Sequence, residues 1–589
     1  MPLLNDTPQK PKVLVPEKLS PDGLALLRTT LDVHEKKGLS AEEILAIIPE
    51  YEALLVRSET KVTATLLGAA KNLKVVARAG VGVDNVDVEA ATKLGIVVVN
   101  SPSGNIGAAA EHTIALMMAA ARNIPEGCST LKAQKWERSR LVGVEVKGKT
   151  LAIIGLGKVG LTVARLAKGL GMNVTAMDPY ASAAVASSAS VTLVPSLNEL
   201  LPSADFLTIH TPLIASTKGM ISTAELAQMK KGSRILNVAR GGTIDEVALL
   251  AALESGHLAG AGIDVFTSEP PQPDSSAAKL IAHPAVVATP HLGASTKEAQ
   301  ENVSIDVCEQ VLQILAGDLP RSAVNAPLIL PEEYQKLQPY VNLIEKMGSL
   351  YTQHYTSSKA PSHRDTFDLI YEGDVASINN TKPLFAALIK GLTAPYSSGA
   401  NVNIVNAELV ARERGIIVNE RRSREPSSQT YSSLVTLVSH PPSRASSRAP
   451  AGSATGTSTP KRVPQQQQII SGTCSASQPI ISRLDRFSTS FVPEDKLLIC
   501  HNYDSPGKIG LVGSILGRQG VNINFMGVAK GRDEEGVAGK SLEVPAEGAE
   551  SGGDQEALMI LGVDREVEES VVNALKEEGG VLSASVVTL

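Results

Sequence analysis

The chain has 589 residues, which is too many for one hydrophobic core, so several domains are expected. Hydrophobic residues make up 43% and charged residues 20%, as in ordinary soluble proteins, and the net charge of −6 does not indicate a nucleic-acid partner. Aromatic residues reach only 3%, which argues against a protein that stacks bases on aromatic side chains.

The cysteines predict a reducing compartment. Cys128, Cys308, Cys474 and Cys500 are scattered, with neither a CxxC pair nor zinc-ligand spacing, so no metal site is expected. The first residues, MPLLNDTPQKPK, lack the apolar run of a signal peptide. These features together predict a cytoplasmic protein.

The first part of the chain alternates short apolar runs with helical patterns. The runs KVLVP, EALLVRS, LKVVARAG and GIVVVNSP fall between residues 11 and 102. Such alternation predicts a parallel α/β sheet. The next stretch, IGAAAEHTIALMMAAAR at 106–122, is too short and too polar to cross a membrane, and a buried helix is expected there.

A second alternating series follows and predicts a doubly wound sheet. Its apolar runs are LAIIGLGKVG, NVTAMDPY, ADFLTIHTP, SRILNVARGG, GAGIDVF and AVVATPHLG. The fold class of this half is therefore α/β, with two Rossmann-like domains.

From residue 331 the pattern changes to an α+β type. A helix is expected over 331–355, strands over 366–376, 431–440 and 479–493, and a strand followed by a helix over 400–418. Residues 441–468 are rich in Ser, Pro, Ala and Gln and are predicted to be a disordered insertion that interrupts this domain.

The tail from residue 496 predicts a small βαββαβ unit of the ferredoxin-like type. LLICHNYD is its first strand, and SPGKIGLVGSILGRQGVNINFM supplies a turn, a helix and a strand. ALMILGVD, VEESVVNALKEEG and VLSASVVTL complete the unit, and residues 530–556 are expected to be a Gly- and Glu-rich loop insertion.

A glycine motif follows the apolar run that begins at residue 151. Gly155, Gly157 and Gly160 have GxGxxG spacing, stand before a helical pattern, and are followed by Asp178 at the end of the next predicted strand. This context favours a dinucleotide site over an ordinary strand–turn–helix with glycines for packing. Because Asp178 can bind the ribose hydroxyls and repel a 2′-phosphate, NAD is expected rather than NADP.

Three ionisable residues follow the ends of later strands in the same half: Arg240, Glu269 and His291. Since ligands bind beyond the carboxyl ends of parallel strands, the three are expected to converge near the nicotinamide. Arginine matches a carboxylate, histidine moves a proton near neutral pH, and a carboxylate fixes the histidine tautomer. Taken singly, each could be a surface charge or a structural histidine.

The segments ILNVARGGTIDEVAL, GAGIDVFTSEPP and TPHLGASTKEAQ resemble the signature segments of the D-isomer-specific 2-hydroxyacid dehydrogenases. The resemblance implies a nucleotide domain at 105–298 inserted in a flavodoxin-like substrate domain at 1–104 plus 299–330. It also implies that Arg240 binds the substrate carboxylate and that His291 with Glu269 does the acid–base work. The cofactor would be lined by Lys158, Val159, Asp178, Thr211, Val238, Ala239, Asp264, Gly293 and Ala294.

The segments LLVRSETKVT and VVARAGVGVDNVD are similar to those of family members that act on phosphoglycerate. This likeness implies oxidation of 3-phospho-D-glycerate to 3-phosphooxypyruvate, the first step of L-serine synthesis, by a homotetramer. Arg57 and Arg78 would then bind the substrate, and Arg138 would reach across a subunit interface. The alternative for each arginine is a solvated charge.

Two carboxyl-terminal domains are also implied by resemblance. AALIKGLTAPYSSGANVNIVNAELVARERGI is similar to the intervening domain of long family members, here 331–493. HNYDSPGKIGLVGSILGRQGVNINFM resembles an ACT domain, here 494–589, in which Asn502, Asp504 and Asn522 match positions that bind an L-serine effector. These residues could instead be ordinary turn residues beside a helix.

Two other functions stay open. The chain could act on glycerate, lactate or 2-hydroxyglutarate, although the arginines of the first half and the two carboxyl-terminal domains argue against it. It could also be an NAD-sensing transcriptional corepressor on the same fold. The ACT-like tail and the lack of a basic or interaction-prone segment beyond RERGIIVNERRSR argue against that alternative.

Overall fold

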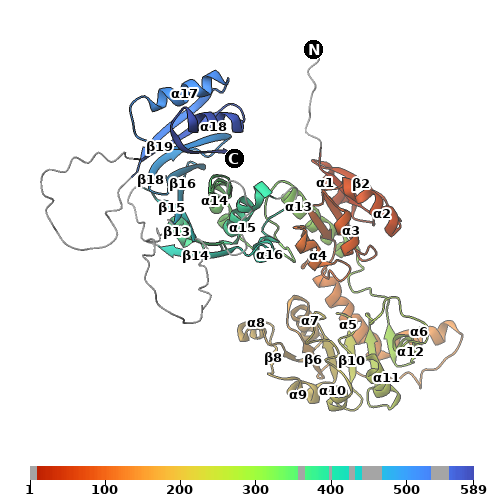
Figure 1. Ribbon diagram of the computed structural model, residues 1–589. Coiled ribbons are helices and arrows are strands. Elements are labelled where there is room, and N and C mark those ends of the chain that lie inside the picture. Colours follow the sequence, from red (N-terminus) through yellow and green to blue (C-terminus); the bar gives the residue numbers. More distant parts are fainter. Residues whose placement is uncertain (1–9, 356–364, 397–400, 424–430, 441–466, 532–555) are drawn as a thin grey trace, which may run out of the picture. The chain divides into compact units, whose positions relative to one another are not determined.

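The computed structural model describes residues 10–355, 365–396, 401–423, 431–440, 467–531 and 556–589. The chain divides into two compact units, Met1–Val86 with Val99–Ala316 and Asp87–Val98 with Gly317–Leu589. Figure 1 labels the helices and strands.

The first sheet has five strands in the order β2-β1-β3-β4-β5, and its central pairs are parallel, as predicted. The strands are β1 (Lys12–Val15), β2 (Asp32–Glu35), β3 (Ala53–Val56), β4 (Val75–Arg78) and β5 (Val97–Asn100). The helices are α1 (Pro21–Arg28), α2 (Ala41–Ile47), α3 (Ala64–Ala69), α4 (Val88–Lys93) and α13 (Lys297–Leu315). Helices α1 and α13 pack closely, because a Cβ on Gly23 would lie 3.1 Å from Sγ of Cys308.

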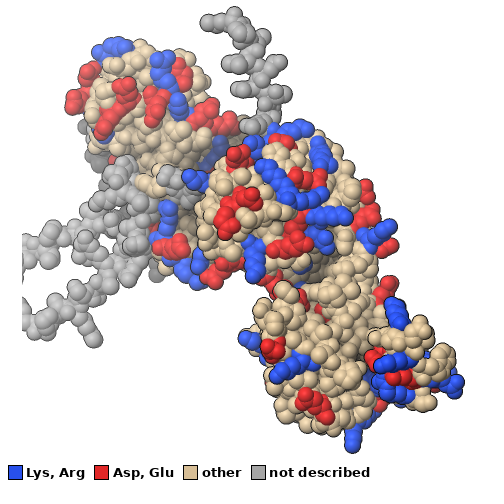
Figure 2. Space-filling model, turned by 90° about the vertical axis from the view of Figure 1, so that its right-hand side faces the viewer, with Lys and Arg blue, Asp and Glu red and all other residues tan. Residues whose placement is uncertain are grey.

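Charges of both signs share the surface of this region. Lys12 pairs with Glu50 at 3.1 Å, and Lys74 pairs with Glu52 at 2.7 Å. In the face drawn in Figure 2, Lys and Arg side chains likewise lie among Asp and Glu side chains. This face therefore differs from the strongly basic surfaces that bind nucleic acids.

The second sheet has seven strands in the order β12-β11-β10-β9-β6-β7-β8, and all its pairs are parallel. Its strands are β6 (Thr150–Ile154), β7 (Asn173–Met177), β8 (Thr192–Leu193), β9 (Phe206–Ile209), β10 (Arg234–Asn237), β11 (Gly260–Ile263) and β12 (Val286–Ala288). This sheet confirms the predicted parallel α/β fold. The strand order reverses between β6 and β9, which is where such sheets bind ligands.

Helices cover both faces of the second sheet (Figure 1). The helices of this part of the chain are α5 (Ile106–Arg122), α6 (Ile124–Lys132), α7 (Lys158–Gly169), α8 (Ala183–Ser188), α9 (Leu197–Leu200), α10 (Thr223–Gln228), α11 (Glu246–Glu254) and α12 (Ser276–Ala282). On β6, Leu151 and Ile153 join the core of α5 and α7, whereas Ala152 and Ile154 join that of α10 and α11. Burial on both faces explains why the strand is apolar throughout.

The helix expected at 106–122 is confirmed with the same bounds as α5. Its buried residues include Thr113, Leu116, Met117 and Ala120. No helix in the described part of the chain has an apolar stretch long enough to cross a membrane.

The third sheet is mixed, in the order β14-β13-β15-β16-β17-β18. Strands β13 and β14 are parallel, and the other pairs are antiparallel. Its strands are β13 (Thr366–Gly373), β14 (Ile417–Ser423), β15 (Ser433–His440), β16 (Gln468–Ser475), β17 (Gln478–Leu484) and β18 (Phe487–Phe491). Helices α14 (Pro331–Tyr355), α15 (Lys382–Thr393) and α16 (Ala407–Glu413) complete this part.

Three expectations are corrected here. The strand expected directly before α16 is not formed, because the described residues 401–406 are a bend and a turn that lead into the helix. The apolar run at 479–493 is two strands, β17 and β18, which reverse at Asp485 with φ +49°. Gln468 belongs to β16, since it pairs with Ser439 of β15, while residues 441–466 lie outside the described residues.

The fourth sheet is antiparallel, in the order β20-β21-β19-β22. Its elements are β19 (Lys496–Tyr503), α17 (Lys508–Arg518), β20 (Ile523–Lys530), β21 (Glu556–Val563), α18 (Glu569–Glu577) and β22 (Val581–Thr588). The chain order is the predicted βαββαβ. Lys530 and Glu556, expected in the loop insertion, are strand residues, and 532–555 lie outside the described residues.

Candidate active site

The glycine motif forms a tight connection between β6 and α7. Gly155 has φ +90°, and a Cβ there would lie 2.7 Å from the His210 carbonyl oxygen. A Cβ on Gly160 would lie 2.1 Å from the Gly155 carbonyl oxygen, so only glycine lets the helix approach the strand. A Cβ on Gly157, by contrast, would meet no atom within 4 Å. This open side leaves the backbone accessible to a ligand.

Asp178, just after β7, is tied to the glycine loop. Its carboxylate accepts hydrogen bonds from the backbone N–H of Leu156 at 2.7 Å and of Tyr180 at 2.8 Å. The side chain is only half-buried, so its remaining acceptor positions are open to a ligand. Lys158, the first residue of α7, donates a hydrogen bond to Ser103 Oγ at 2.7 Å.

These residues fit a dinucleotide. Helix α7 begins without a side-chain cap, so its first N–H groups are available to an anion. Thr211 Oγ1 is buried and has no hydrogen-bond partner among the described residues. Gly293 lies against Val238, since a Cβ on it would be 2.9 Å from the valine side chain.

The side chains of the predicted cofactor residues differ in how far they are buried. Val159 is partly buried in the core of α5 and α7, and Val238 is 9% exposed in the same core. Ala239 and Ala294 are half-buried. For the two valines, the backbone is the part left to contact a cofactor.

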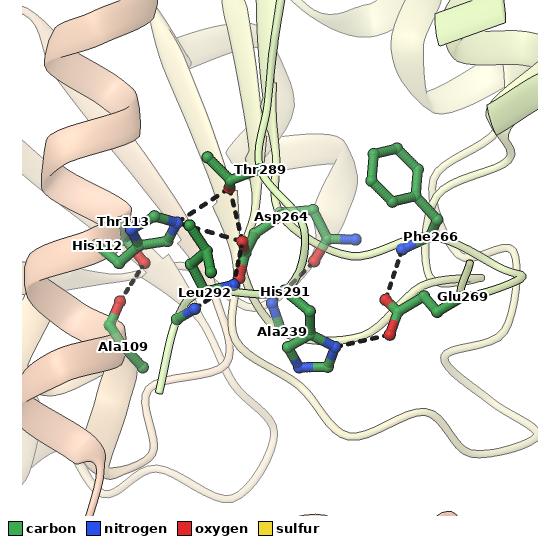
Figure 3. Close-up of polar contacts among 12 residues, drawn as sticks. Ala109, His112, Thr113, Ala239, Asp264, Phe266, Glu269, Thr289, His291 and Leu292 are labelled. Carbon is green, nitrogen blue, oxygen red and sulfur yellow. Dashed lines mark hydrogen bonds and ion pairs between the residues drawn. The ribbon is translucent and has the colours of Figure 1, made fainter. Parts of the chain in front are cut away.

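His291 and Glu269, predicted as an acid–base pair, lie in contact (Figure 3). Nδ1 of His291 is 2.7 Å from Oε2 of Glu269. Oε1 of Glu269 accepts a hydrogen bond from the backbone N–H of Phe266 at 3.0 Å, which fixes the carboxylate. With Nδ1–H donating to the carboxylate, Nε2 is the ring atom left to exchange a proton with a substrate.

The contact changes the pKa of both groups. The hydrogen bond with Glu269 raises the pKa of His291 above its ordinary value of 6.5, although burial opposes the rise. Burial alone would raise the pKa of Glu269, but the hydrogen bonds from His291 and the Phe266 N–H outweigh it, so this pKa is lowered. Each partner therefore stabilises the charged form of the other.

A fully buried acid, Asp264, holds the loop that carries His291. His291 has φ +54°, and its N–H donates to the Asp264 carbonyl oxygen at 2.9 Å. The Asp264 carboxylate accepts from the N–H groups of Leu292 at 2.7 Å and Gly293 at 2.9 Å. Asp264 thus binds the N–H groups of His291 and of the two following residues, and these bonds hold His291 in its left-handed conformation.

Two further side chains meet the same carboxylate (Figure 3). Thr289 Oγ1 donates to Asp264 at 2.6 Å, and His112 Nε2 of α5 lies 3.3 Å from Asp264 and 3.1 Å from Thr289. Burial alone would raise the pKa of Asp264, but these hydrogen bonds outweigh it and lower the value. The acid therefore stays ionised inside the protein.

Three arginines gather beside this pair. Burial lowers the pKa of Arg78, and the charges of Arg240 and Arg57 lower it further, while Asp84 and Glu17 oppose the shift. The Arg78 Nε atom is buried and has no hydrogen-bond partner among the described residues. Arg78 therefore lies among other cations, and its guanidinium group lacks a full set of hydrogen-bond partners among the described residues.

Arg240 connects the arginines with the histidine. Its Nε lies 3.3 Å from Oδ2 of Asp84, and its charge also acts on His291. Gly80 and Gly82 leave room for the guanidinium groups, because a Cβ on either would lie 2.0 Å from a nitrogen of Arg78 or Arg240. Arg240, Glu269 and His291 are therefore close to one another, and their place beside the nicotinamide stays a prediction.

Comparison with known proteins agrees with this geometry. Residues 114–293 match the D-isomer specific 2-hydroxyacid dehydrogenase NAD binding domain, and residues 336–464 match the D-3-phosphoglycerate dehydrogenase intervening domain. D-3-phosphoglycerate dehydrogenase 2, chloroplastic, of Arabidopsis thaliana is 44% identical over 538 residues, which cover 89% of this chain and 82% of the relative. The chain belongs to the D-3-phosphoglycerate dehydrogenase family.

More distant family members match nearly end to end. The D-3-phosphoglycerate dehydrogenase of Archaeoglobus fulgidus is 39% identical over 579 residues, covering 98% of this chain and 100% of the relative. That of Bacillus subtilis is 38% identical over 580 residues, covering 98% and 99%. The matched dehydrogenase domain binds NAD, so NAD is the cofactor, and the chain is an NAD-dependent oxidoreductase.

Arg138 does not join the other arginines. It is exposed on the segment that follows α6. Its segment folds back on α6, since Arg140 pairs with Glu126 at 2.6 Å. In this chain, therefore, Arg138 lies outside the cluster of Arg57, Arg78 and Arg240.

The predicted effector residues are only partly brought together. Asn502 and Asp504 line a cavity of about 410 Å³ at the start of α17. Oδ1 of Asn502 is buried and has no partner among the described residues, and Asp504 pairs with Lys530 at 2.7 Å. Asn522 does not line this cavity, and its N–H donates to Asp564.

Several contributors were missed from the sequence. Glu17, Asp84, Asn85, His112 and Thr289 all contact predicted site residues. Only His112 had a signal, because a histidine stands out in an apolar helix, but nothing in the sequence identified its partner. In the described part of the chain, no group of three or more His, Cys, Asp or Glu could hold a metal ion.

Proposed function

We propose that this protein oxidises 3-phospho-D-glycerate to 3-phosphooxypyruvate with NAD, the first step of L-serine synthesis. The proposal rests on one observation: the His291–Glu269 pair lies beside a cluster of three arginines. A substrate with both a carboxylate and a phosphate needs several cations, and arginine binds each group with paired hydrogen bonds. Lactate and glycerate would leave part of this charge unused.

Each residue of the cluster has one proposed task. Arg240, next to His291, binds the substrate carboxylate, and Arg57 with Arg78 binds the phosphate. Neutral His291 takes the proton of the C2 hydroxyl on Nε2, and Glu269 stabilises the imidazolium that forms. NAD, when bound, accepts the hydride from C2.

The cofactor side follows the glycine loop. Asp178 is proposed to bind the ribose hydroxyls, with the N–H groups at the start of α7 facing the pyrophosphate. The open space at Gly157 and the unpartnered Thr211 hydroxyl support this assignment. The further residues proposed to line the cofactor are Lys158, Val159, Val238, Ala239, Asp264, Gly293 and Ala294.

The proposed domains are those expected from the sequence. They are a substrate domain at 1–104 plus 299–330, a nucleotide domain at 105–298, an intervening domain at 331–493 and an ACT domain at 494–589. The βαββαβ order and the antiparallel sheet of the last part support the ACT assignment. A cytoplasmic homotetramer, with Arg138 reaching a partner's site, completes the proposal.

A turnover assay tests the activity. The purified protein should reduce NAD with 3-phospho-D-glycerate and prefer it at least tenfold in kcat/KM over D-glycerate, D-lactate and 2-hydroxyglutarate. Equal activity on the unphosphorylated acids would refute the phosphate assignment. No turnover of any of them would refute the enzyme assignment and leave the dinucleotide sensor.

The ACT assignment has its own test. L-serine should bind the intact protein at the cavity beside Asn502 and inhibit it, with D-serine as the control. Asn502→Ala should weaken L-serine binding. Asn522→Ala should also weaken it, because Asn522 is proposed to reach the site from a second copy of the chain. Calorimetry at millimolar L-serine without heat would leave the domain a structural role.

A further inference from the structure

Glu17 is a buried acid that binds the turn at residues 57–60, which follows β3. It follows β1 after Pro16 and is only 6% exposed. Its Oε1 accepts hydrogen bonds from the backbone N–H of Arg57 at 3.0 Å and of Thr60 at 2.9 Å, and its Oε2 accepts from Glu59 N–H at 3.2 Å. A carboxylate is buried at acceptable cost only with such partners, so acid and turn are held together.

Asn85 holds the same turn by its carbonyl groups. Its side-chain amide donates to the carbonyl oxygens of Arg57 at 2.9 Å and Thr60 at 2.7 Å. Its own carbonyl accepts from Val62 N–H at 2.8 Å, which ties it to the end of the turn. Residues 57–60 are therefore fixed through both their donors and their acceptors.

Glu17 also supplies negative charge to the arginines. Its charge acts on Arg78 together with that of Asp84. Asp84, which is largely exposed, has the larger effect of the two on Arg78, and the buried Glu17 adds to it. The buried acid thus offsets part of the repulsion between Arg78 and its neighbouring cations.

We infer that Glu17 is a positioning residue for phosphate recognition, because it holds the turn that carries Arg57. The inference rests on the proposed function, in which Arg57 and Arg78 bind the phosphate. Glu17 itself is not placed to touch a substrate, because it is only 6% exposed and its oxygens already accept from three backbone N–H groups. It should therefore affect substrate binding and leave the chemical step alone.

Glu17→Gln tests this role with little change of shape. The glutamine oxygen can still accept from Arg57 and Thr60, but Glu59 loses its acceptor and the cluster loses a charge. KM for 3-phospho-D-glycerate should rise at least fivefold, with kcat and KM for NAD within twofold of wild type. The matched control is Glu50→Gln, an exposed acid paired with Lys12, which should stay within twofold throughout.

A double variant separates positioning from general damage. If Glu17 acts through Arg57, adding Glu17→Gln to Arg57→Ala should raise KM by less than twofold beyond Arg57→Ala alone. Additive effects, an unchanged KM for Glu17→Gln, or a fall in kcat as large as the rise in KM would each overturn the inference.

These experiments also distinguish a failure of the Glu17 inference from a failure of the proposed phosphate binding on which it rests. A wild type that does not prefer the phosphorylated substrate, or an Arg57→Ala variant with unchanged KM, refutes the phosphate assignment and the inference with it. If Arg57→Ala raises KM and Glu17→Gln does not, only the inference fails. Should Glu17→Gln not fold, Asn85→Ala must give the same rise in KM, and an unchanged KM there overturns the inference.

Discussion

His291 combines a left-handed backbone with a raised side-chain pKa. Its φ of +54° is held by Asp264 and the following N–H groups, and its pKa is raised by the hydrogen bond with Glu269. The backbone directs the ring, and the carboxylate sets its proton affinity. A base of this kind works best when its pKa lies near the working pH.

The pH dependence of oxidation follows from this pair. Oxidation needs neutral His291, so kcat/KM should rise with pH through the raised pKa of the folded enzyme. Glu269→Gln removes the charge that stabilises the imidazolium, so the rise should move to lower pH. His291→Ala should lower kcat/KM for oxidation by at least about a hundredfold. A pH–rate series at saturating NAD checks both, and an unmoved limb in Glu269→Gln would refute the pairing.

Arg78 lies among other cations and has one buried nitrogen without a partner among the described residues. It is mostly buried, its Nε lacks a partner among the described residues, and Arg240 and Arg57 repel it. A buried cation that is repelled by other cations and only partly compensated destabilises the folded state, and a bound anion would relieve this cost. The same features that weaken the ligand-free protein therefore favour a phosphate.

Arg78→Met should separate the two effects. Loss of a charge-assisted contact costs about 1.5–3 kcal/mol, so KM for 3-phospho-D-glycerate should rise roughly ten- to hundredfold. The melting temperature of the ligand-free protein should rise, because the repulsion is removed. The control Arg28→Met, at an exposed position of α1, should leave KM within about twofold. A lower melting temperature with unchanged KM would mean that Arg78 is structural.

At the scale of elements, β6 and α7 use their three glycines for different purposes. Gly155 and Gly160 meet each other and the His210 carbonyl, so they are required for the fold. Gly157 faces open space with φ −70°, a value that any residue adopts. It is therefore the glycine whose absent side chain matters to a ligand rather than to folding.

Alanine substitutions should distinguish these roles. Gly157→Ala should leave the melting temperature of the ligand-free protein within about 2 °C, since alanine there loses no contact. It should raise the Kd for NAD at least tenfold. Gly160→Ala should lower the melting temperature itself, because its Cβ would overlap the Gly155 carbonyl. Calorimetry and NAD titration check both, and unchanged NAD binding in Gly157→Ala would place the pyrophosphate elsewhere.

At the scale of the whole molecule, one segment carries several exposed apolar side chains, which predict an interface with a partner. Ile124, Leu131, Trp136 and Val142, on α6 and the segment after it, are 54%, 58%, 82% and 79% exposed. Four exposed large apolar side chains within one short stretch are typical of an interaction surface, so we expect a partner to cover it. Arg138 belongs to the same stretch, which fits its proposed reach into the site of a second copy.

Trp136→Glu should therefore reduce the oligomer and its activity together. A charge in an apolar interface is left without water or a partner. Light scattering should show a smaller particle, and KM for 3-phospho-D-glycerate should rise if Arg138 serves the neighbouring site. Val247→Glu, an exposed apolar position on α11, is the control and should stay wild type. An unchanged particle size would show that this stretch is not the interface.

Local patterns in the sequence determined the parallel sheets, helix α5, the glycine motif and the set Arg240, Glu269 and His291. Each depends on neighbouring residues or on the rule that parallel strands end at one edge, which holds whatever the packing. The strand pattern failed for β2, whose DVHE is polar, and for β16, which is a strand because it pairs with β15.

Only the tertiary structure decided which distant groups meet. Glu17 lies forty residues before Arg57, and His112 lies 152 residues before Asp264, so no local pattern links either pair. Their contacts form because buried donors and acceptors must find partners once the chain is packed. The same packing leaves Arg78 without a full set of partners and Arg138 outside the cluster, two facts that no spacing in the sequence contains.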